Sequence, residues 1–117
     1  MTIHHAQKFL AKMRQDRNLS IQLEQASTDV WECYRNKNDQ ATFGSVQTLI
    51  ASGVLNAVVR VAAEMGYPME GKELIAAVRG RLRRRLEQKE ISCRDYIVAR
   101  QMVSEGDLLI DALLAYC

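Results

Sequence analysis

Histidine and cysteine carry much of the acid-base, nucleophilic and metal chemistry of proteins, and this chain has few of either. The two histidines, His4 and His5, are adjacent near the N-terminus. Adjacent helical residues point to different sides, so this pair is not the i, i+4 pair of a zinc-binding helix. The sequence also has no glycine-rich phosphate loop, dinucleotide fingerprint or Gly-x-Ser-x-Gly elbow. We therefore expect no catalytic residue, no metal site and no cofactor.

The three cysteines, Cys33, Cys93 and Cys117, are odd in number and widely spaced, and none belongs to a Cys-x-x-Cys pair. This pattern differs from that of a disulfide framework or a structural zinc site. It favours reduced thiols in a cytoplasmic protein with no disulfide-linked partner. Because a buried free cysteine behaves as a small hydrophobe, we expect Cys33 and Cys93 in the core and Cys117 at the surface.

The strongest charged feature is the run Arg79–Arg85, which holds five arginines in seven positions. Their guanidinium groups could form bidentate pairs with carboxylates or phosphates. Helical rotation directs Arg79, Arg83 and Arg84 away from the apolar face of the run, so these three are candidate partner-binding residues. The alternative is a solvated helix face whose charge is balanced by the acidic residues that follow it, Glu87, Glu90, Asp95 and Glu105.

The run contains no aromatic residue, whereas single-stranded nucleic-acid sites place aromatic stacking platforms beside basic groups. An acidic protein partner is therefore favoured over nucleic acid. A small nucleic-acid-binding regulator that uses Arg79–Arg85 is the alternative function.

Trp31 and Tyr34 are further candidate partner-binding residues. They lie three positions apart, so a helix would place them on one face. If exposed, they would form an aromatic anchor pair of the kind found at interaction hot spots. Packing of the tryptophan in the core is the alternative.

The composition of the chain limits the classes of protein to which it can belong. With 117 residues, 48% of them hydrophobic and 26% charged, the chain has the make-up of one folded globular domain. Lys+Arg 16 against Asp+Glu 14 leaves a net charge of only +2, which is not the footprint of a dedicated nucleic-acid binder. No apolar stretch approaches the roughly 20 residues that span a bilayer. We expect a cytoplasmic protein with no membrane contact.

Apolar residues recur at helical spacing, as in Ala6, Phe9, Leu10 and Met13, and predict an all-α fold. We expect one compact domain over residues 1–117 with about six or seven helices. In the valine-rich stretch 54–61 a strand is the local alternative. Helices are expected at residues 3–15, 19–26, 30–34, 42–65 with a break or kink at Gly53, 74–86, 92–103 and 108–116. A polar loop is expected at 36–40.

Capping residues mark the predicted helix boundaries. The Ser-Thr-Asp run at 27–29 predicts a helix start, and so do Ser92 with Asp95 and, farther on, Asp107. Gly66 is placed to end the central helix in a left-handed conformation. For the helix 92–103 we expect the buried side to consist of Tyr96, Ile97, Ala99, Met102 and Val103.

Two blocks of the sequence carry a family resemblance. The first is Ala6-Gln7-Lys8-Phe9-Leu10-x-x-Met13-x-x-Asp16-x-x-Leu19-x-x-x-Leu23. The second is Val59-x-x-Ala62-x-x-x-Gly66-Tyr67-x-x-x-Gly71-Lys72-Glu73-Leu74. They resemble the small helical nitrogen-fixation domain family, whose members include leader-like proteins encoded in nitrogenase gene clusters. In this comparison 1–27 and 54–75 match the family blocks, 28–53 is an apparent insertion, and 76–117 is a helical extension.

The resemblance implies a binding protein without its own cofactor. The expected partner is nitrogenase, in particular its molybdenum-iron protein, in an immature, damaged or protected state. A leader-type domain recognised by a processing enzyme is a further alternative. The sequence shows nothing like the double-glycine cleavage site of the peptide leaders, so we do not expect a peptide precursor.

Overall fold

The computed structural model describes residues 3–37 and 43–117, and every regular element in these stretches is an α-helix. The helices are α1 (Ile3–Gln15), α2 (Arg17–Lys37), α3 (Phe43–Glu64), α4 (Gly71–Glu87), α5 (Cys93–Glu105) and α6 (Leu109–Tyr116). The predicted all-α bundle is confirmed for the described part of the chain. The valine-rich stretch 54–61 lies within α3 and is helical.

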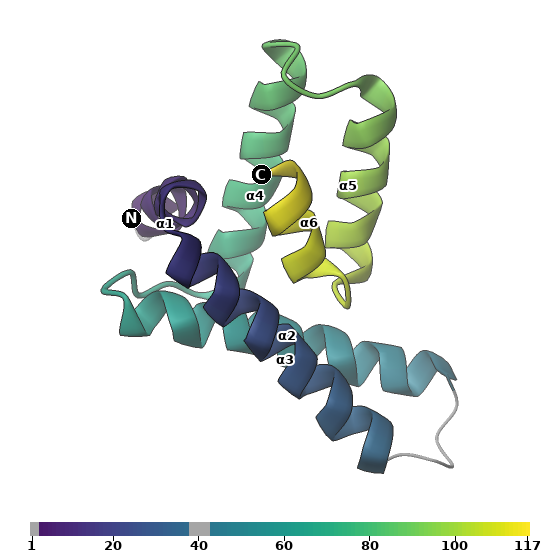
Figure 1. Ribbon diagram of the computed structural model, residues 1–117. Coiled ribbons are helices and arrows are strands. Elements are labelled where there is room, and N and C mark those ends of the chain that lie inside the picture. The colour runs from purple at the N-terminus through teal and green to yellow at the C-terminus, as the bar shows by residue number, and fades with distance from the viewer. Residues whose placement is uncertain (1–2, 38–42) are drawn as a thin grey trace.

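The helices form two groups that share one core (Figure 1). The long helices α2 and α3 pack against each other, while α4 and α5 stand side by side at an angle to that pair. α1 packs mainly on α4. α6 fits between α5 and the α2–α3 pair, so the last helix joins the two groups. The molecule measures 45 × 33 × 26 Å along its principal axes.

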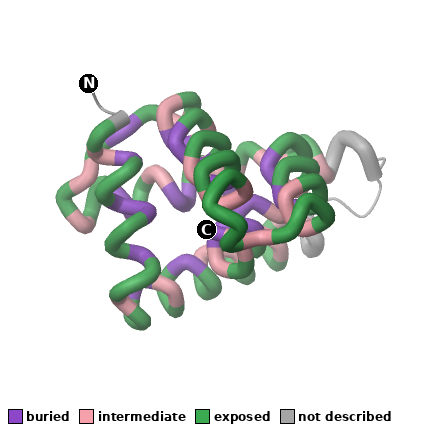
Figure 2. The backbone as a smooth tube through the Cα atoms, turned by 90° about the horizontal axis from the view of Figure 1, so that it is seen from above, coloured by how far each residue is buried: buried purple, intermediate pink, exposed green. Residues whose placement is uncertain are grey.

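The core confirms the predicted apolar face of α1, because Ala6, Phe9, Leu10 and Met13 are all buried. Figure 2 shows buried segments on the helix sides that face one another. The largest fully buried side chains are Phe9, Leu10, Leu19, Leu23, Val54, Val58, Leu74, Val78, Leu82, Leu109, Ile110 and Leu113. Burial of each such side chain favours folding by about 1.5–3 kcal/mol relative to exposure. As predicted, α6 docks on the core.

α2 is one continuous helix where the sequence predicts two, so the helix start predicted at 27–29 is wrong. The Thr28 hydroxyl donates to the Glu24 carbonyl at 3.1 Å, a bond made inside a helix. Threonine can satisfy its hydroxyl at a helix start or by such back-bonding, and the long contact with α3 selects the second. Residues 36 and 37 also belong to α2, against the loop prediction, and 38–40 lie outside the described residues.

α3 continues through Gly53 as one helix, so of the predicted break or kink the break is wrong. The glycine instead permits close approach of α2. A Cβ placed on Gly53 would lie 2.9 Å from Val30 Cγ1 and 3.1 Å from Tyr34 Cε2. Its role is therefore to make room at a helix crossing.

Two predicted caps are confirmed. Gly66 has φ +91° at the end of the turn after α3, a conformation that favours glycine. The Ser92 hydroxyl accepts the Asp95 N–H at 3.0 Å at the start of α5. A further first-turn contact at α4 was not predicted, in which Glu73 Oε1 accepts the Glu70 N–H at 3.1 Å.

The predicted cap at Asp107 is wrong, because Leu108 occupies the N-cap position of α6 and no side chain caps there. Asp107 is buried, with 6% of its surface exposed. Its Oδ2 accepts from the Gln47 amide of α3 at 3.4 Å, while Oδ1 has no hydrogen-bond partner among the described residues.

The cysteines reverse the predicted burial. Cys33 on α2 and Cys93 at the first residue of α5 are exposed, whereas Cys117 is buried. Cys117 follows α6 and is held against α4 by Arg81, whose Nε donates to the Cys117 backbone oxygen at 2.9 Å. Burial is the main reason that the pKa of the Cys117 thiol rises to about 11.

Candidate functional site

The structure divides the arginines of α4 into two groups with different surroundings. Arg79, Arg83 and Arg84 are exposed, which confirms the orientation predicted from the helical period. Arg81 and Arg85 are only partly exposed and turn toward the end of α6. One sequence run therefore supplies both a solvent-facing surface and an internal contact.

Arg81 and Arg85 bind the C-terminal end of α6. Besides the bond from Arg81, Arg85 donates from Nη1 to the Tyr116 carbonyl, and its Nε lies 3.1 Å from Glu90 Oε2. Cations at this position stabilise the helix, because they interact favourably with the negative end of its dipole and donate hydrogen bonds to carbonyls that lack a helical partner. Partial burial, and to a smaller extent the neighbouring arginines, lower the pKa of Arg81 from its usual value. These two residues have a structural role.

A groove of about 210 Å³ lies between α4 and α5, and we call it the arginine groove. Its lining consists of Arg79, Gly80, Leu82, Arg83, Tyr96 and Arg100. Leu82 is buried and forms an apolar floor, Tyr96 is half-buried, and the three arginines are exposed. No carboxylate lines the groove. The site therefore combines three guanidinium groups with the phenol ring of Tyr96.

Arg84 faces a different part of the surface. It lines a second groove of about 280 Å³, between α1 and α4, together with Arg81 and with small residues such as Ala11 and Ala77. The structure thus brings Arg79 and Arg83 together with Arg100 and places Arg84 on the other side of α4. Gly80 lines both grooves.

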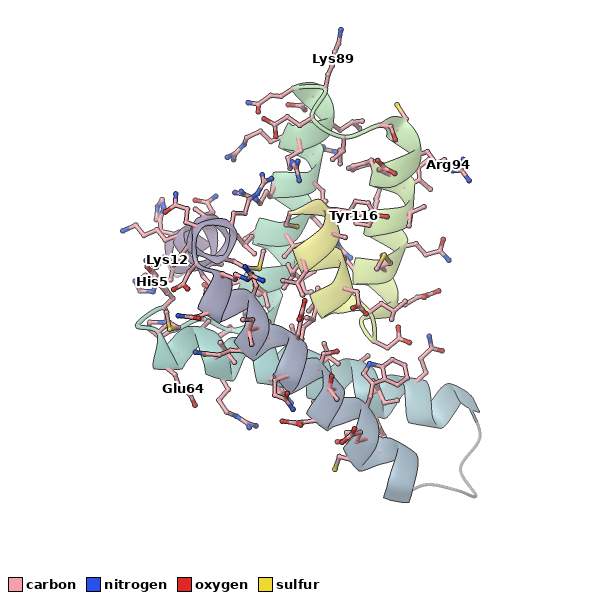
Figure 3. All side chains as sticks on the ribbon, in the orientation of Figure 1. His5, Lys12, Glu64, Lys89, Arg94 and Tyr116 are labelled. Carbon is pink, nitrogen blue, oxygen red and sulfur yellow. The ribbon has the colours of Figure 1, made fainter. Side chains whose placement is uncertain are left out.

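The end of the molecule where α4 connects to α5 carries exposed charges of both signs, because Glu87 and Glu90 lie there together with Lys89 and Arg94. Lys89 and Arg94 are exposed there, and both side chains project away from the molecule (Figure 3).

Trp31 and Tyr34 do not form an exposed anchor pair. Both are half-buried on α2 and pack against the core, the role that the sequence left as the alternative for the tryptophan. Neither lines the arginine groove. The exposed apolar side chains lie elsewhere and include Ile97, which is 64% exposed although the sequence placed it on the buried side of α5.

The two histidines differ in their surroundings. His5 Nδ1 lies 3.0 Å from the Pro68 carbonyl, which ties α1 to the turn before α4, and His4 is exposed. In the described residues no three histidine, cysteine or acidic side chains gather as a group that could hold a metal. Within the same residues, every helix falls short of what a membrane span requires in length and hydropathy.

Sequence reasoning missed Gly80, Leu82, Tyr96 and Arg100 as site residues. A partial signal was present, since Tyr96 and Arg100 are four positions apart and therefore share a face of α5. The short connection between the helices also favours antiparallel neighbours. The sequence already placed Ala99 and Val103 on the buried side of α5, and the structure confirms this. That α5 packs beside α4, so that Tyr96 and Arg100 lie next to Arg79 and Arg83, was visible only in the structure.

Comparisons of this chain with models of protein families, with curated proteins and with solved structures find no match.

Proposed function

We propose that this protein is a non-catalytic accessory factor that binds nitrogenase, with the molybdenum-iron protein as its target. The role is that of a nitrogenase-associated factor similar to the one called nitrogenase-associated factor T. The resemblance of residues 1–27 and 54–75 to the nitrogen-fixation domain family supports this choice of partner. The bound state is an immature, damaged or protected form of the enzyme.

The observation that carries the binding role is the set of three exposed arginines on α4, two of which line the arginine groove while the third lines the second groove. Arg79, Arg83 and Arg84 are all exposed, and none forms an ion pair with a described carboxylate. Arginine is enriched at protein interfaces, where its planar donors pair with carboxylates. Ile97 adds exposed apolar surface three positions before Arg100, on the helix next to α4. An acidic protein surface that also carries an exposed apolar side chain matches this composition.

The test is capture of purified molybdenum-iron protein by the full chain, compared with the variant Arg79→Ala/Arg83→Ala/Arg84→Ala. Exposed substitutions change stability by only about 0.5 kcal/mol, whereas loss of interface arginines costs about 1.4 kcal/mol or more, a tenfold loss of affinity. We expect capture to weaken at least about tenfold at an unchanged melting temperature.

The matched control is Lys8→Ala/Lys12→Ala/Arg60→Ala, which also removes three exposed positive charges but leaves the three α4 arginines in place. Equal loss in both variants would mean that only net charge matters and would refute a defined α4 surface. No capture of any nitrogenase form by the unaltered protein would refute the proposed partner.

Nucleic-acid binding is the second candidate, and Tyr96 favours it. The arginine run has no aromatic residue of its own, but the fold places this ring beside Arg79 and Arg83. Stacking next to guanidinium groups is typical of single-stranded nucleic-acid sites. Binding of an oligonucleotide that survives physiological salt, with no capture of nitrogenase, would favour this function over the first.

A further inference from the structure

The arginine groove has the chemistry of a small-anion site. We propose that it binds a compact phosphate monoester, with the phosphoryl group held by Arg79, Arg83 and Arg100. This inference goes beyond the proposed function, because it concerns a small ligand and is testable without any protein partner. Two helices contribute the cations, since Arg79 and Arg83 come from α4 and Arg100 comes from α5, which lie side by side in Figure 1.

The charge of the groove favours a dianion. The ion pairs among the described side chains are Lys72 with Glu70 and Arg85 with Glu90, so the three groove arginines have no described carboxylate within 4.0 Å. Like charges around one small volume repel each other, and an anion between them removes that repulsion. A phosphate monoester carries close to two negative charges at neutral pH and offers three acceptor oxygens, which suits several guanidinium groups better than a single carboxylate.

Gly80 supports a ligand at this position. A Cβ placed on it meets no atom within 4 Å, so helix packing does not require a glycine there. Glycine is unfavourable inside a helix, and alanine would stabilise α4 if only folding mattered. The missing side chain leaves the helix surface open where the groove is lined by Arg79 and Arg83. A phosphoryl group could approach the backbone there.

The volume of the arginine groove and its uncharged lining residues limit the size of the organic part of the ligand. The volume of about 210 Å³ is below the range of pockets that hold drug-sized molecules. Leu82 and the ring of Tyr96 offer apolar contact next to the cations, and the phenol can donate to an oxygen. We therefore expect a phosphate attached to one small group, such as a single sugar.

The test is calorimetric titration of the full chain with inorganic phosphate, ribose 5-phosphate and adenosine monophosphate, at constant ionic strength set with sodium chloride. We expect inorganic phosphate and ribose 5-phosphate to bind, the ester more tightly, and the larger adenosine monophosphate to bind no more tightly than ribose 5-phosphate. Arg79→Gln, Arg83→Gln and Arg100→Gln should each weaken binding about tenfold or more. Arg84→Gln is the matched control, because it removes an exposed arginine from the same helix outside the groove and should change affinity less than about twofold.

Gly80→Ala separates a ligand site from a folding role. We expect its melting temperature to rise by about 2–6 °C, since alanine favours the helix and has open space, while phosphate binding weakens. A variant that is more stable and binds equally well would overturn the role of Gly80 and with it the proposed position of the phosphoryl group.

The proposal is overturned if none of the three ligands binds at up to roughly 10 mM, or if Arg84→Gln weakens binding as much as Arg83→Gln. It is also overturned if an oligonucleotide binds far more tightly with a steep salt dependence, since that result indicates an extended nucleic-acid site. The nitrogenase proposal has a separate readout. Arg100→Gln tests the phosphate site and leaves all three arginines of the partner-capture test intact.

Discussion

Gly53 shows at the scale of one residue how a glycine can serve packing between helices. It lies inside α3, where glycine is less favourable than alanine by about 0.5–1 kcal/mol. The Cβ that alanine would add meets Val30 of α2 at 2.9 Å, closer than atoms normally approach. Replacement by alanine is therefore expected to lower the stability of the protein at Gly53 and to raise it at Gly80, where the space is open.

We predict that Gly53→Ala lowers the stability of the protein, because overpacking of about 1–3 kcal/mol exceeds the gain in helix propensity. Val30→Ala should remove the closest contact, the one with Val30. We therefore expect the double variant to be more stable, by about 1 kcal/mol, than the added effects of the two single substitutions would predict. Urea unfolding of the four proteins in the cycle measures this coupling. Additive effects would show that α2 shifts freely and that the close approach is unimportant.

At the scale of elements, α6 is held at its C-terminal end by two side chains from α4. Arg81 and Arg85 donate to the backbone oxygens of Cys117 and Tyr116, respectively. α6 spans only 8 residues, and an isolated helix of that length is unstable in water. Its stability must come from the buried apolar face and from these contacts with its last turn.

We predict that Arg81→Met and Arg85→Met each destabilise the protein by about 1 kcal/mol, since a helix-end hydrogen bond from a cation is lost while the apolar stem is largely kept. The amides of α6 should exchange with deuterium faster than in the unaltered protein. Arg83→Met is the control, because this residue is exposed on the same helix. Equal protection of α6 in all three variants would contradict the role assigned to the two arginines.

At the scale of the whole molecule, burial of Cys117 links global stability to pH. The pKa of the thiol rises from the ordinary value of 9.0 to about 11 on folding, chiefly because the thiol is removed from water. Between these values the folded protein keeps the thiol proton and the unfolded chain has released it. The contribution to stability is thus complete below pH 9 and is lost as the pH rises toward 11.

We predict a loss on the order of 2 kcal/mol from this group over that interval, since one pKa unit corresponds to about 1.4 kcal/mol. Unfolding by urea at several pH values measures it. Because rising pH also changes the charge of the rest of the protein, Cys117→Ala serves as the reference and should lose less stability with rising pH. Parallel curves for the two proteins would contradict the assignment.

The helical periods and several helix ends were predictable because they depend on short-range spacing and backbone chemistry. The apolar face of α1, the left-handed Gly66 and the Ser92 cap all follow from residues within one or two turns. The predicted start at 27–29 failed because a threonine hydroxyl has two local solutions, and contact with α3 selected one of them. The cap predicted at Asp107 is wrong for a similar reason, because the Asp107 carboxylate accepts a hydrogen bond from Gln47, which is distant in the sequence.

The local pattern of residues was enough to predict the helices of the described residues and the exposure of Arg79, Arg83 and Arg84, because the period of a helix is a local property. Which of these arginines line the same groove depends on how the helices pack. Packing of α5 on α4 brings Tyr96 and Arg100 to Arg79 and Arg83, and leaves Arg84 facing α1. It also turned Arg81 and Arg85 into supports for α6. The physical reason is that a helix specifies the directions of its side chains, whereas their neighbours depend on how buried faces of separate helices fit together.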